Sequence, residues 1–254
     1  MAHLPTFGAS TVAMARLFFR TIVGTRKTWV MALVVLGGLA IAVIGRLFGP
    51  SHAQARIYGV LLSQVTLGFV VQLLGLLYGI AAVREDVEAR TLTWLLVRPI
   101  PRAAIVLGRW LGALALVTGV MVAFALVTHL VAGTVGPSLA VVLGATALGA
   151  IYYTTAFVAI ATVAPRPFLV GLGYILFWEF ALPLVPSNAA TLSMKFHLLN
   201  LIGTPTAASG PLSFLVPTVD PWSSLLTLVL LTGALGALAL WVFPRRELLG
   251  SRES

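Results

Sequence analysis

Nucleophilic and metal-binding side chains are few in this 254-residue chain, and none forms the cluster that an enzyme active site needs. There is no cysteine, which excludes thiolate metal sites and cysteine nucleophiles. The zinc-protease motif and the Gly-x-Ser-x-Gly motif are both absent. The histidines stand far apart in sequence, at positions His3, His52, His129 and His197. We therefore expect no metal site, no catalytic residues and no enzymatic activity in this chain.

The densest group of charged side chains lies in residues 84–109, which read REDVEARTLTWLLVRPIPRAAIVLGR. Arg84 with Glu88, and Asp86 with Arg90, are opposite charges four residues apart, and such pairs favour a helix. An apolar stretch continues the helix, and two prolines end it; these residues are Leu92, Trp94, Leu95, Leu96, Pro99 and Pro101. The segment predicts a short stiff helix that transmits force to or from a partner. A solvated helix without a partner is the alternative.

The composition identifies the elements that must position these residues. Hydrophobic residues make up 59% of the chain and charged residues 9%, whereas a soluble domain has about 25% charged residues. With a mean hydropathy of +1.04, the chain is expected to be a single all-α polytopic membrane domain over residues 1–254. A membrane-spanning helix needs about 20 apolar residues. The six expected spans are 29–48, 57–83, 103–132, 139–164, 168–185 and 222–243.

The distribution of positive charge predicts the orientation, because lysine and arginine collect on the cytoplasmic side. With both termini in the cytoplasm, only Arg46, Arg56 and Lys195 of the 16 basic residues lie outside. The basic excess therefore reports topology and not nucleic-acid binding. Residues 10–28 carry Val12 and Phe19 on one helical face and Arg16 on another, which favours an amphipathic helix in the inner interface. A cytoplasmic extension of the first span is the alternative.

Glu179 is the one acidic residue deep in an expected span. It lies 11 residues after Phe168, so about 16 Å into the membrane, where an ionised carboxylate is costly. It either contacts substrate or a proton on a transport path, or makes a structural hydrogen bond. Tyr152, Tyr153 and a backbone group near Pro183 are the expected partners for such a bond.

The second span carries small and polar residues on one helical face, at Gln64, Gly68, Gln72, Gly75 and Gly79. Small residues let helices approach closely, and glutamine can form hydrogen bonds across the interface. Helix packing is the favoured interpretation, and the alternative is that Gln64 and Gln72 line a transport path. Outside the membrane, residues 186–221 form a long proline-rich segment. Within it, residues 192–202 predict a short interfacial or re-entrant helix. This helix is either an outer gate or a lid with no role in the transport mechanism.

Residues 84–109 resemble the signature of ABC-2 type transporter permeases. That signature has two acidic residues, Thr-Leu, two leucines, Arg-Pro, a further arginine, and glycine before a basic residue. The matching residues here are Glu85, Glu88, Thr91, Leu92, Leu95, Leu96, Arg98, Pro99, Arg102, Gly108 and Arg109. Arg90 stands where many members have glycine, and Arg109 where many have lysine. The specific part of the resemblance is about 25 residues long, and six spans with cytoplasmic termini agree with it.

The resemblance implies the membrane subunit of an ATP-driven transporter, an exporter in the cell membrane of a bacterium or archaeon. Two such subunits, identical or different, would pair with two separate ATPase subunits. Residues 84–102 would be the coupling segment, docked through Arg84, Glu85, Asp86, Glu88, Arg90, Thr91, Leu92, Leu95 and Arg98. This chain lacks the Gly-x-x-x-x-Gly-Lys-Ser/Thr motif, so ATP and Mg²⁺ would be used by the partner ATPase.

Two other classes of function fit the sequence less well. A proton- or ion-coupled secondary transporter using Glu179 would often show an internal repeat, and the two halves of this chain show none. It would also leave the charged segment without a role. An intramembrane protease would need a nucleophile and a base paired within the spans. The sequence shows no such pair. The spans hold no charged binding constellation, which favours a lipid-like or amphipathic substrate over a highly charged one.

Overall fold

Long apolar sequences become long helices, because backbone groups in a membrane must be satisfied within their own segment. The computed structural model describes residues 7–23, 25–49, 54–88, 102–133, 136–184, 188–203 and 219–243, and within these ranges the chain is helical with no β-strand. The elements in chain order are α1 (Phe7–Val23), α2 (Arg26–Phe48), α3 (Gln54–Val60), the π-helix η2 (Leu61–Val70), α4 (Val71–Glu88), α6 (Arg102–Ala132), α7 (Leu139–Val163), α8 (Pro167–Gly173), the π-helix η3 (Tyr174–Ala181), the 3₁₀ helices η4 (Leu182–Leu184) and η5 (Asn188–Leu192), α9 (Met194–Ile202) and α10 (Pro221–Val242).

Five helices are long and apolar enough to cross a membrane. They are Thr28–Phe48, Gln54–Arg84, Ala103–Ala132, Leu139–Val163 and Pro221–Val242, and they correspond to five of the six expected spans. The remaining expected span, 168–185, forms the shorter apolar helix Pro167–Ala181. Fifteen helical residues reach about 22 Å, less than the roughly 30 Å hydrocarbon core. A sixth crossing by this segment therefore stays a prediction.

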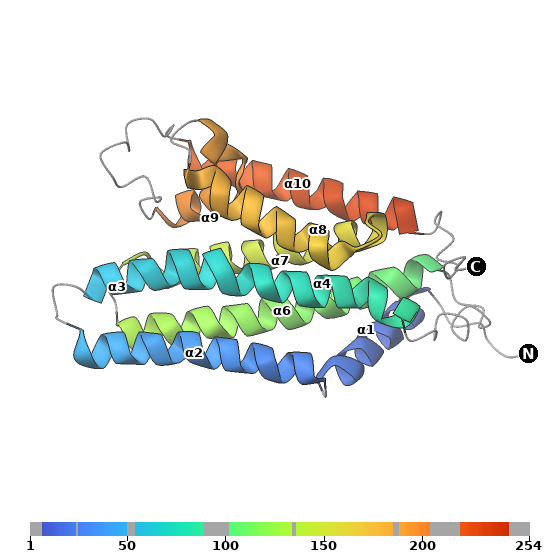
Figure 1. The fold of residues 1–254 in the computed structure, drawn as a ribbon, viewed down its shortest axis with the longest axis horizontal. Coiled ribbons are helices and arrows are strands. Elements are labelled where there is room, and N and C mark those ends of the chain that lie inside the picture. Colours follow the sequence, from blue (N-terminus) through green and yellow to red (C-terminus); the bar gives the residue numbers. More distant parts are fainter. Residues whose placement is uncertain are drawn as a thin grey trace, which may run out of the picture.

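The long helices run side by side and give the bundle two distinct ends (Figure 1). One end holds α1, the end of α4, the start of α6, the α7–α8 turn and the end of α10; we call it the α1 end. The other end holds α9, the start of α3 and the start of α10; we call it the α9 end. The α1 end collects most of the described arginines, in agreement with the expected inside, although the side of the membrane stays a prediction.

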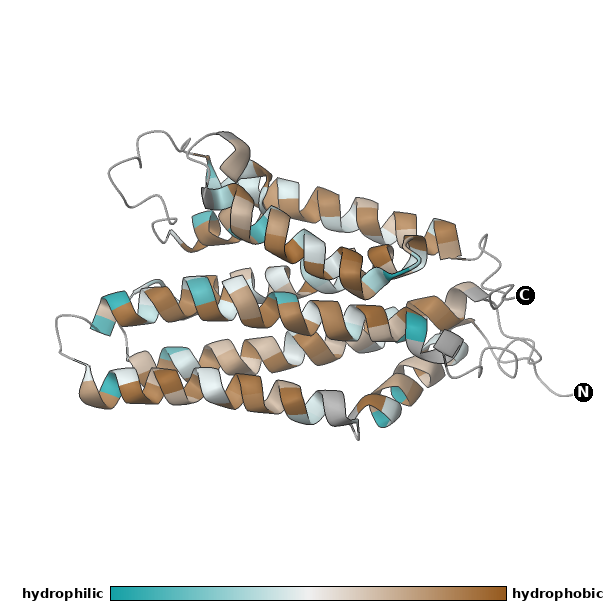
Figure 2. Ribbon diagram, viewed as in Figure 1, coloured by the Kyte–Doolittle hydropathy of each residue, from teal (hydrophilic) through white to brown (hydrophobic). Residues whose placement is uncertain are grey.

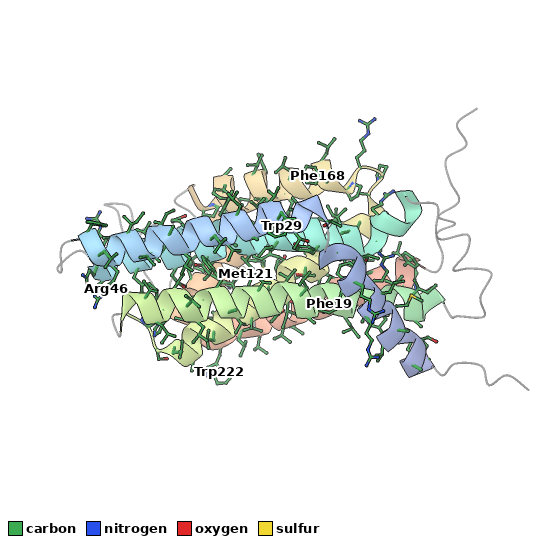
Figure 3. The ribbon with its side chains drawn as sticks, turned by 90° about the horizontal axis from the view of Figure 1, so that it is seen from below. Phe19, Trp29, Arg46, Met121, Phe168 and Trp222 are labelled. Carbon is green, nitrogen blue, oxygen red and sulfur yellow. The ribbon has the colours of Figure 1, made fainter. Side chains whose placement is uncertain are left out.

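Apolar residues run along the whole length of the long helices (Figure 2). Trp29 and Trp222 project outward from the bundle, as does Phe168 (Figure 3), and the two tryptophans are 75% and 72% exposed. In water such a surface would be a large uncovered apolar patch. Hydrocarbon solvates it instead, and the chain is therefore an integral membrane protein.

Glycines in α4 let it approach α7 closely. A Cβ added at Gly75 would lie 3.0 Å from the Tyr153 carbonyl carbon, and one at Gly79 would lie 2.9 Å from the Thr154 carbonyl oxygen. Backbone contact of this kind is possible only for small residues. The packing interpretation of the second-span glycines is confirmed at these two positions.

α1 is a separate helix that packs across the start of α6. The apolar part of its buried face consists of Met14, Phe18 and Ile22, spaced four residues apart as one helical stripe. Val12, expected with the apolar face, is 52% exposed instead. A helix that lies in the membrane surface can direct such an exposed apolar side chain into lipid. Arg16 is also exposed. The helix is thus no simple extension of the first span, and its place in the interface stays a prediction.

Gly108 of α6 is the position at which α1 comes closest. A Cβ there would lie 2.4 Å from the Thr11 carbonyl oxygen and 2.7 Å from Met14 Cβ. We expect Gly108→Ala to push α1 off α6 and to cost about 1–3 kcal/mol of stability through overpacking, measured as a lower thermal unfolding temperature in detergent. Gly119→Ala is the control, because Gly119 lies in the same helix with nothing within 4 Å of its Cβ position. Equal unfolding temperatures for the two variants would contradict this packing.

Candidate functional site

α9 is a nine-residue helix with two buried ionisable side chains. Lys195 is 8% exposed and His197 5%. The first N–H groups of any helix lack partners within that helix, and a helix that begins inside a bundle cannot obtain them from bulk water. A neighbouring helix must supply acceptors for these N–H groups, and other neighbours hold the polar side chains of α9.

Glu179 of η3 caps the N-terminus of α9. Its side chain is fully buried and accepts four hydrogen bonds: from the Tyr174 hydroxyl at 2.8 Å, the Ser193 hydroxyl at 2.7 Å, Met194 N at 3.2 Å and Lys195 N at 3.0 Å. An ionised carboxylate only accepts, and four donors match that form. The positive end of the α9 dipole stabilises the charge further. The geometry therefore favours the structural hydrogen-bond interpretation of Glu179 over a contact on a transport path.

A chain of hydroxyl groups orients this carboxylate. The Tyr174 hydroxyl donates to Glu179, so its oxygen accepts from the Tyr152 hydroxyl at 3.1 Å. Of the two expected tyrosine partners, Tyr153 interacts with the Glu179 side chain directly, whereas Tyr152 reaches it only through Tyr174. Tyr174, five residues before Glu179, is the partner that was not expected. Both lie in the π-helix η3, whose i to i+5 geometry brings such residues onto one side. α-Helical spacing does not pair them, and this is why the sequence did not reveal the contact.

Gln64 of η2 holds the side chain of Lys195. The Lys195 ammonium donates to Gln64 Oε1 at 2.8 Å and lies 5.4 Å from the centre of the Phe180 ring. Gly68 makes room for it, since a Cβ there would lie 2.9 Å from Lys195 Nζ. Burial lowers the pKa of Lys195, and the charge of Glu179 opposes that shift. Two of the three expected path residues, Gln64 and Glu179, therefore both contact Lys195 at the start of α9.

The third expected path residue, Gln72, is fully buried between helices. Its Nε2 donates to the Tyr153 hydroxyl at 3.2 Å, which ties α4 to α7. The structure thus separates Gln72 from the pair that holds α9. Helix packing accounts for Gln72. The small and polar residues of the second span thus face two neighbours: Gln64 and Gly68 face α9, and Gln72 faces α7.

His197 and Asn200 tie α9 to α10. The carbonyl oxygen of Thr191 can only accept, so His197 Nε2 donates to it at 2.9 Å, and Nδ1 accepts from the Ser224 hydroxyl at 3.0 Å. Asn200 Nδ2 donates to Ser224 Oγ at 2.9 Å and to the Val219 carbonyl oxygen at 2.8 Å. The network fits a neutral imidazole. The sequence signal for this pair is the i, i+3 spacing of His197 and Asn200, which places them on one helical face.

At the α1 end, the expected coupling residues fall into two groups. Arg84 is described, and its Nη2 donates to the carbonyl oxygens of Ala164 and Pro165 at the end of α7. α4 continues as helix to Glu88, although the side chains of Glu85, Asp86 and Glu88 lie outside the described part of the chain. Arg90, Thr91, Leu92, Leu95 and Arg98 lie wholly outside it, so the coupling segment as such stays a prediction.

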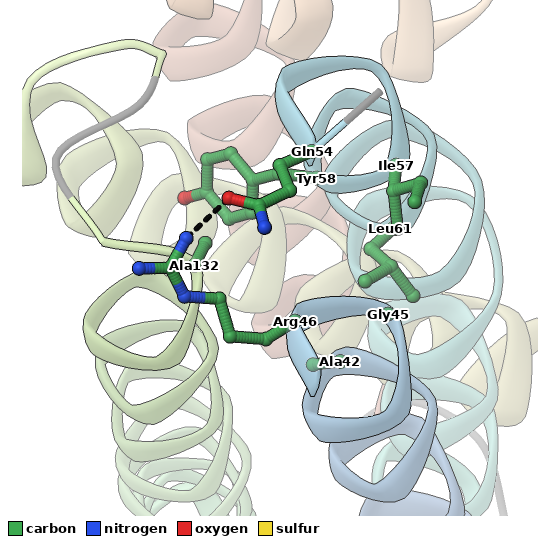
Figure 4. Close-up of a pocket in the computed structure, with 8 residues that line it drawn as sticks. All are labelled: Ala42, Gly45, Arg46, Gln54, Ile57, Tyr58, Leu61 and Ala132. Atoms are coloured by element: carbon green, nitrogen blue, oxygen red, sulfur yellow. Dashed lines mark hydrogen bonds between the residues drawn. The ribbon is translucent and has the colours of Figure 1, made fainter. Parts of the chain in front are cut away.

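A small cavity lies near the α9 end, between α2, α3 and α6 (Figure 4). Arg46 donates to Gln54 Oε1 across it, and Tyr58 on its wall forms a hydrogen bond of 2.7 Å with His129 Nδ1. Its volume of about 20 Å³ is enough for roughly one water molecule, so it is too small for a transported substrate. No group of three or more metal-ligating side chains occurs among the described residues.

The Glu179 cap can be tested by removing its charge. We expect Glu179→Gln to cost about 1–3 kcal/mol of stability, because an amide group faces the donors with its own N–H and leaves a buried donor unpaired. Thermal unfolding in detergent measures the loss. Ser193→Ala serves as the comparison, since it removes one of the four bonds and leaves both backbone donors paired. A Glu179→Gln protein as stable as the wild type would show that the cap does not hold α9.

The His197 contacts predict a dependence on pH. Burial lowers the pKa of His197 below its ordinary value of 6.5, against smaller opposing effects of the Thr191 carbonyl and the Glu179 charge. As the pH falls, His197 therefore binds a proton at a higher pH in the unfolded chain than in the folded chain. The contribution of His197 is complete above pH 6.5 and is lost as the pH falls from there through the lower folded-state pKa.

Unfolding temperatures measured between about pH 7.5 and about pH 5 test this dependence. His197→Gln keeps a donor and an acceptor without titrating, so we expect it to lose less stability on acidification than the wild type. Identical pH profiles for the two proteins would exclude His197 as the source.

Comparison with known proteins agrees with this architecture. The model of the ABC-2 family transporter proteins matches residues 12–248, which is nearly the whole chain. No curated protein matches the chain. The match includes most of α1, the five long apolar helices and the α9 region. The chain belongs to the ABC-2 transporter family and is the membrane permease component of an ABC transporter.

Proposed function

We propose that this chain is the permease half of an ATP-driven exporter, and that a separate ATPase docks on residues 84–102. The observation that carries the proposal is one continuous helix, Gln54–Glu88. It runs unbroken from Gln64, which holds α9, to the acidic residues of the coupling segment. Twenty-four residues separate these points, about 36 Å along a helix. A movement imposed at Glu88 is thereby transmitted to the α9 end by a single stiff element.

The same family membership supports an ATPase partner. A permease without a nucleotide-binding motif needs ATP and Mg²⁺ bound elsewhere, and two ATPase copies beneath a pair of permeases would meet that need. In this arrangement the α1 end is cytoplasmic. Arg16, Arg84 and Arg166 at that end support the orientation through the positive-inside rule, and α1 would lie in the inner interface.

We further propose that the transport path lies between two permease subunits, identical or different. Gln64 supports this placement, because it is exposed on η2 ten residues into a membrane-spanning helix. An amide facing hydrocarbon at that depth is unfavourable. Its Oε1 accepts from Lys195, and a second subunit or a water-filled path would cover the exposed remainder of the amide. The cavity between α2, α3 and α6 is too small to serve as the path.

α9 is suited to act as the outer gate in this scheme. It is short and is held by side-chain hydrogen bonds from η2, η3 and α10, and each of these bonds can break without unfolding a spanning helix. A path lined by apolar helices with one exposed glutamine favours an amphipathic or lipid-like substrate. The secondary-transporter alternative needs Glu179 to exchange protons, and four donors already occupy that carboxylate.

The acidic residues of the coupling segment provide the direct test. We expect the double variant Glu85→Lys, Glu88→Lys to insert normally but to lose stimulation of the co-expressed ATPase, because reversed charges would repel the surface that accepts them. ATPase activity in proteoliposomes and co-purification of the ATPase are the measurements. Arg56→Glu, a charge reversal at the α9 end, is the control. Normal stimulation in the double variant would contradict docking through this segment.

A further inference from the structure

Arg84 is turned into the bundle, although it opens the charged segment. Its Nη2 donates to the Ala164 carbonyl oxygen and, at 3.2 Å, to the Pro165 carbonyl oxygen. Carbonyl groups at a helix C-terminus lack partners in the helix and carry partial negative charge. A guanidinium that bridges two of them is a charge-assisted contact. Arg84 thus joins the last part of α4 to the corner between α7 and α8.

This corner has few other ways to hold its shape. Pro165 and Pro167 have no backbone N–H, and the Ala164 N–H is used by the Ile160 carbonyl oxygen at 2.8 Å. Beyond the corner, α8 presses against its neighbours. A Cβ added at Gly171 would lie 2.3 Å from Leu76 Cδ1. α8 thus packs closely against the Leu76 side chain of α4.

α8 leads without interruption into η3, which carries Glu179 and the cap of α9. A displacement of the corner therefore reaches α9 by a second route, distinct from the continuous helix Gln54–Glu88. Both routes start at the same place, because Arg84 lies on α4 four residues before Glu88.

We propose that Arg84 is a positioning residue that carries movement of the coupling segment into α7 and α8, and that it does not itself dock on the ATPase. The proposal rests on the proposed function, since it needs an ATPase to move the segment. Arg84→Gln removes the charge and shortens the side chain. Arg84→Lys keeps the charge but replaces the planar fork by a single ammonium group. The matched control is Arg166→Gln, an exposed arginine on the same corner.

The experiment measures nucleotide-driven movement of α8 in the complete complex with its ATPase. The chain has no native cysteine, so Trp29→Cys on α2 and Phe168→Cys on α8 place two spin labels at exposed positions. The distance between them is compared in nucleotide-free and ATP-trapped complexes. We expect a shift in the labelled wild type and in Arg166→Gln, none in Arg84→Gln, and a partial shift in Arg84→Lys. ATP-dependent transport should fall roughly tenfold in Arg84→Gln, while the ATPase co-purifies in unchanged amount.

Each other outcome has a defined meaning. A full shift in Arg84→Gln would overturn the proposal, and loss of the ATPase from that variant would show that Arg84 docks it. If Arg84→Gln does not assemble, Arg84→Lys decides between the same outcomes. A wild-type complex without nucleotide-driven movement or ATP-dependent transport would overturn the proposed function itself. That result is visible before any Arg84 variant is compared.

Discussion

A helix that begins inside a membrane bundle needs acceptors for its first N–H groups, and this requirement organises the α9 end of the protein. Glu179 meets it with one carboxylate that accepts from two backbone groups and two hydroxyls. Burial of that charge is tolerable because the α9 N-terminus and its donors compensate it. The carboxylate also binds the Tyr174 hydroxyl and so holds η3 beside the start of α9. Lys195 then lies within hydrogen-bonding distance of Gln64.

Two π-helical stretches, η2 and η3, supply the residues that hold α9. π-Helical turns are uncommon and occur frequently at functional sites. Each changes the direction in which side chains leave its helix. In η2 it aims Gln64 and Gly68 at α9, while Gly75 farther along the same helix faces α7. Both unusual stretches thus contact the N-terminal part of α9.

The long helices could be predicted from the sequence because apolar length alone determines them, and the boundaries agree within a few residues. The close packing of Gly75 and Gly79 followed from their spacing. The bond between Tyr174 and Glu179 could not be predicted, since a π-helix changes which residues share a side and no pattern in the sequence indicated one. The inward direction of Arg84 was equally hidden. A charged residue beside other charged residues gives no sign that its acceptors are carbonyl groups eighty positions away.

The docking of α1 on α6 has a consequence for how the protein is made. Phe18 packs against Gly112, and residues so far apart in the chain emerge from the ribosome at different times. At about 5–20 residues per second, roughly ninety intervening residues take on the order of 5–20 s to synthesise. During that interval the apolar stripe of α1 has no protein partner. Lipid at the membrane surface is the one apolar solvent within reach. α1 is therefore expected to rest there first and to be recruited into the bundle only when α6 arrives.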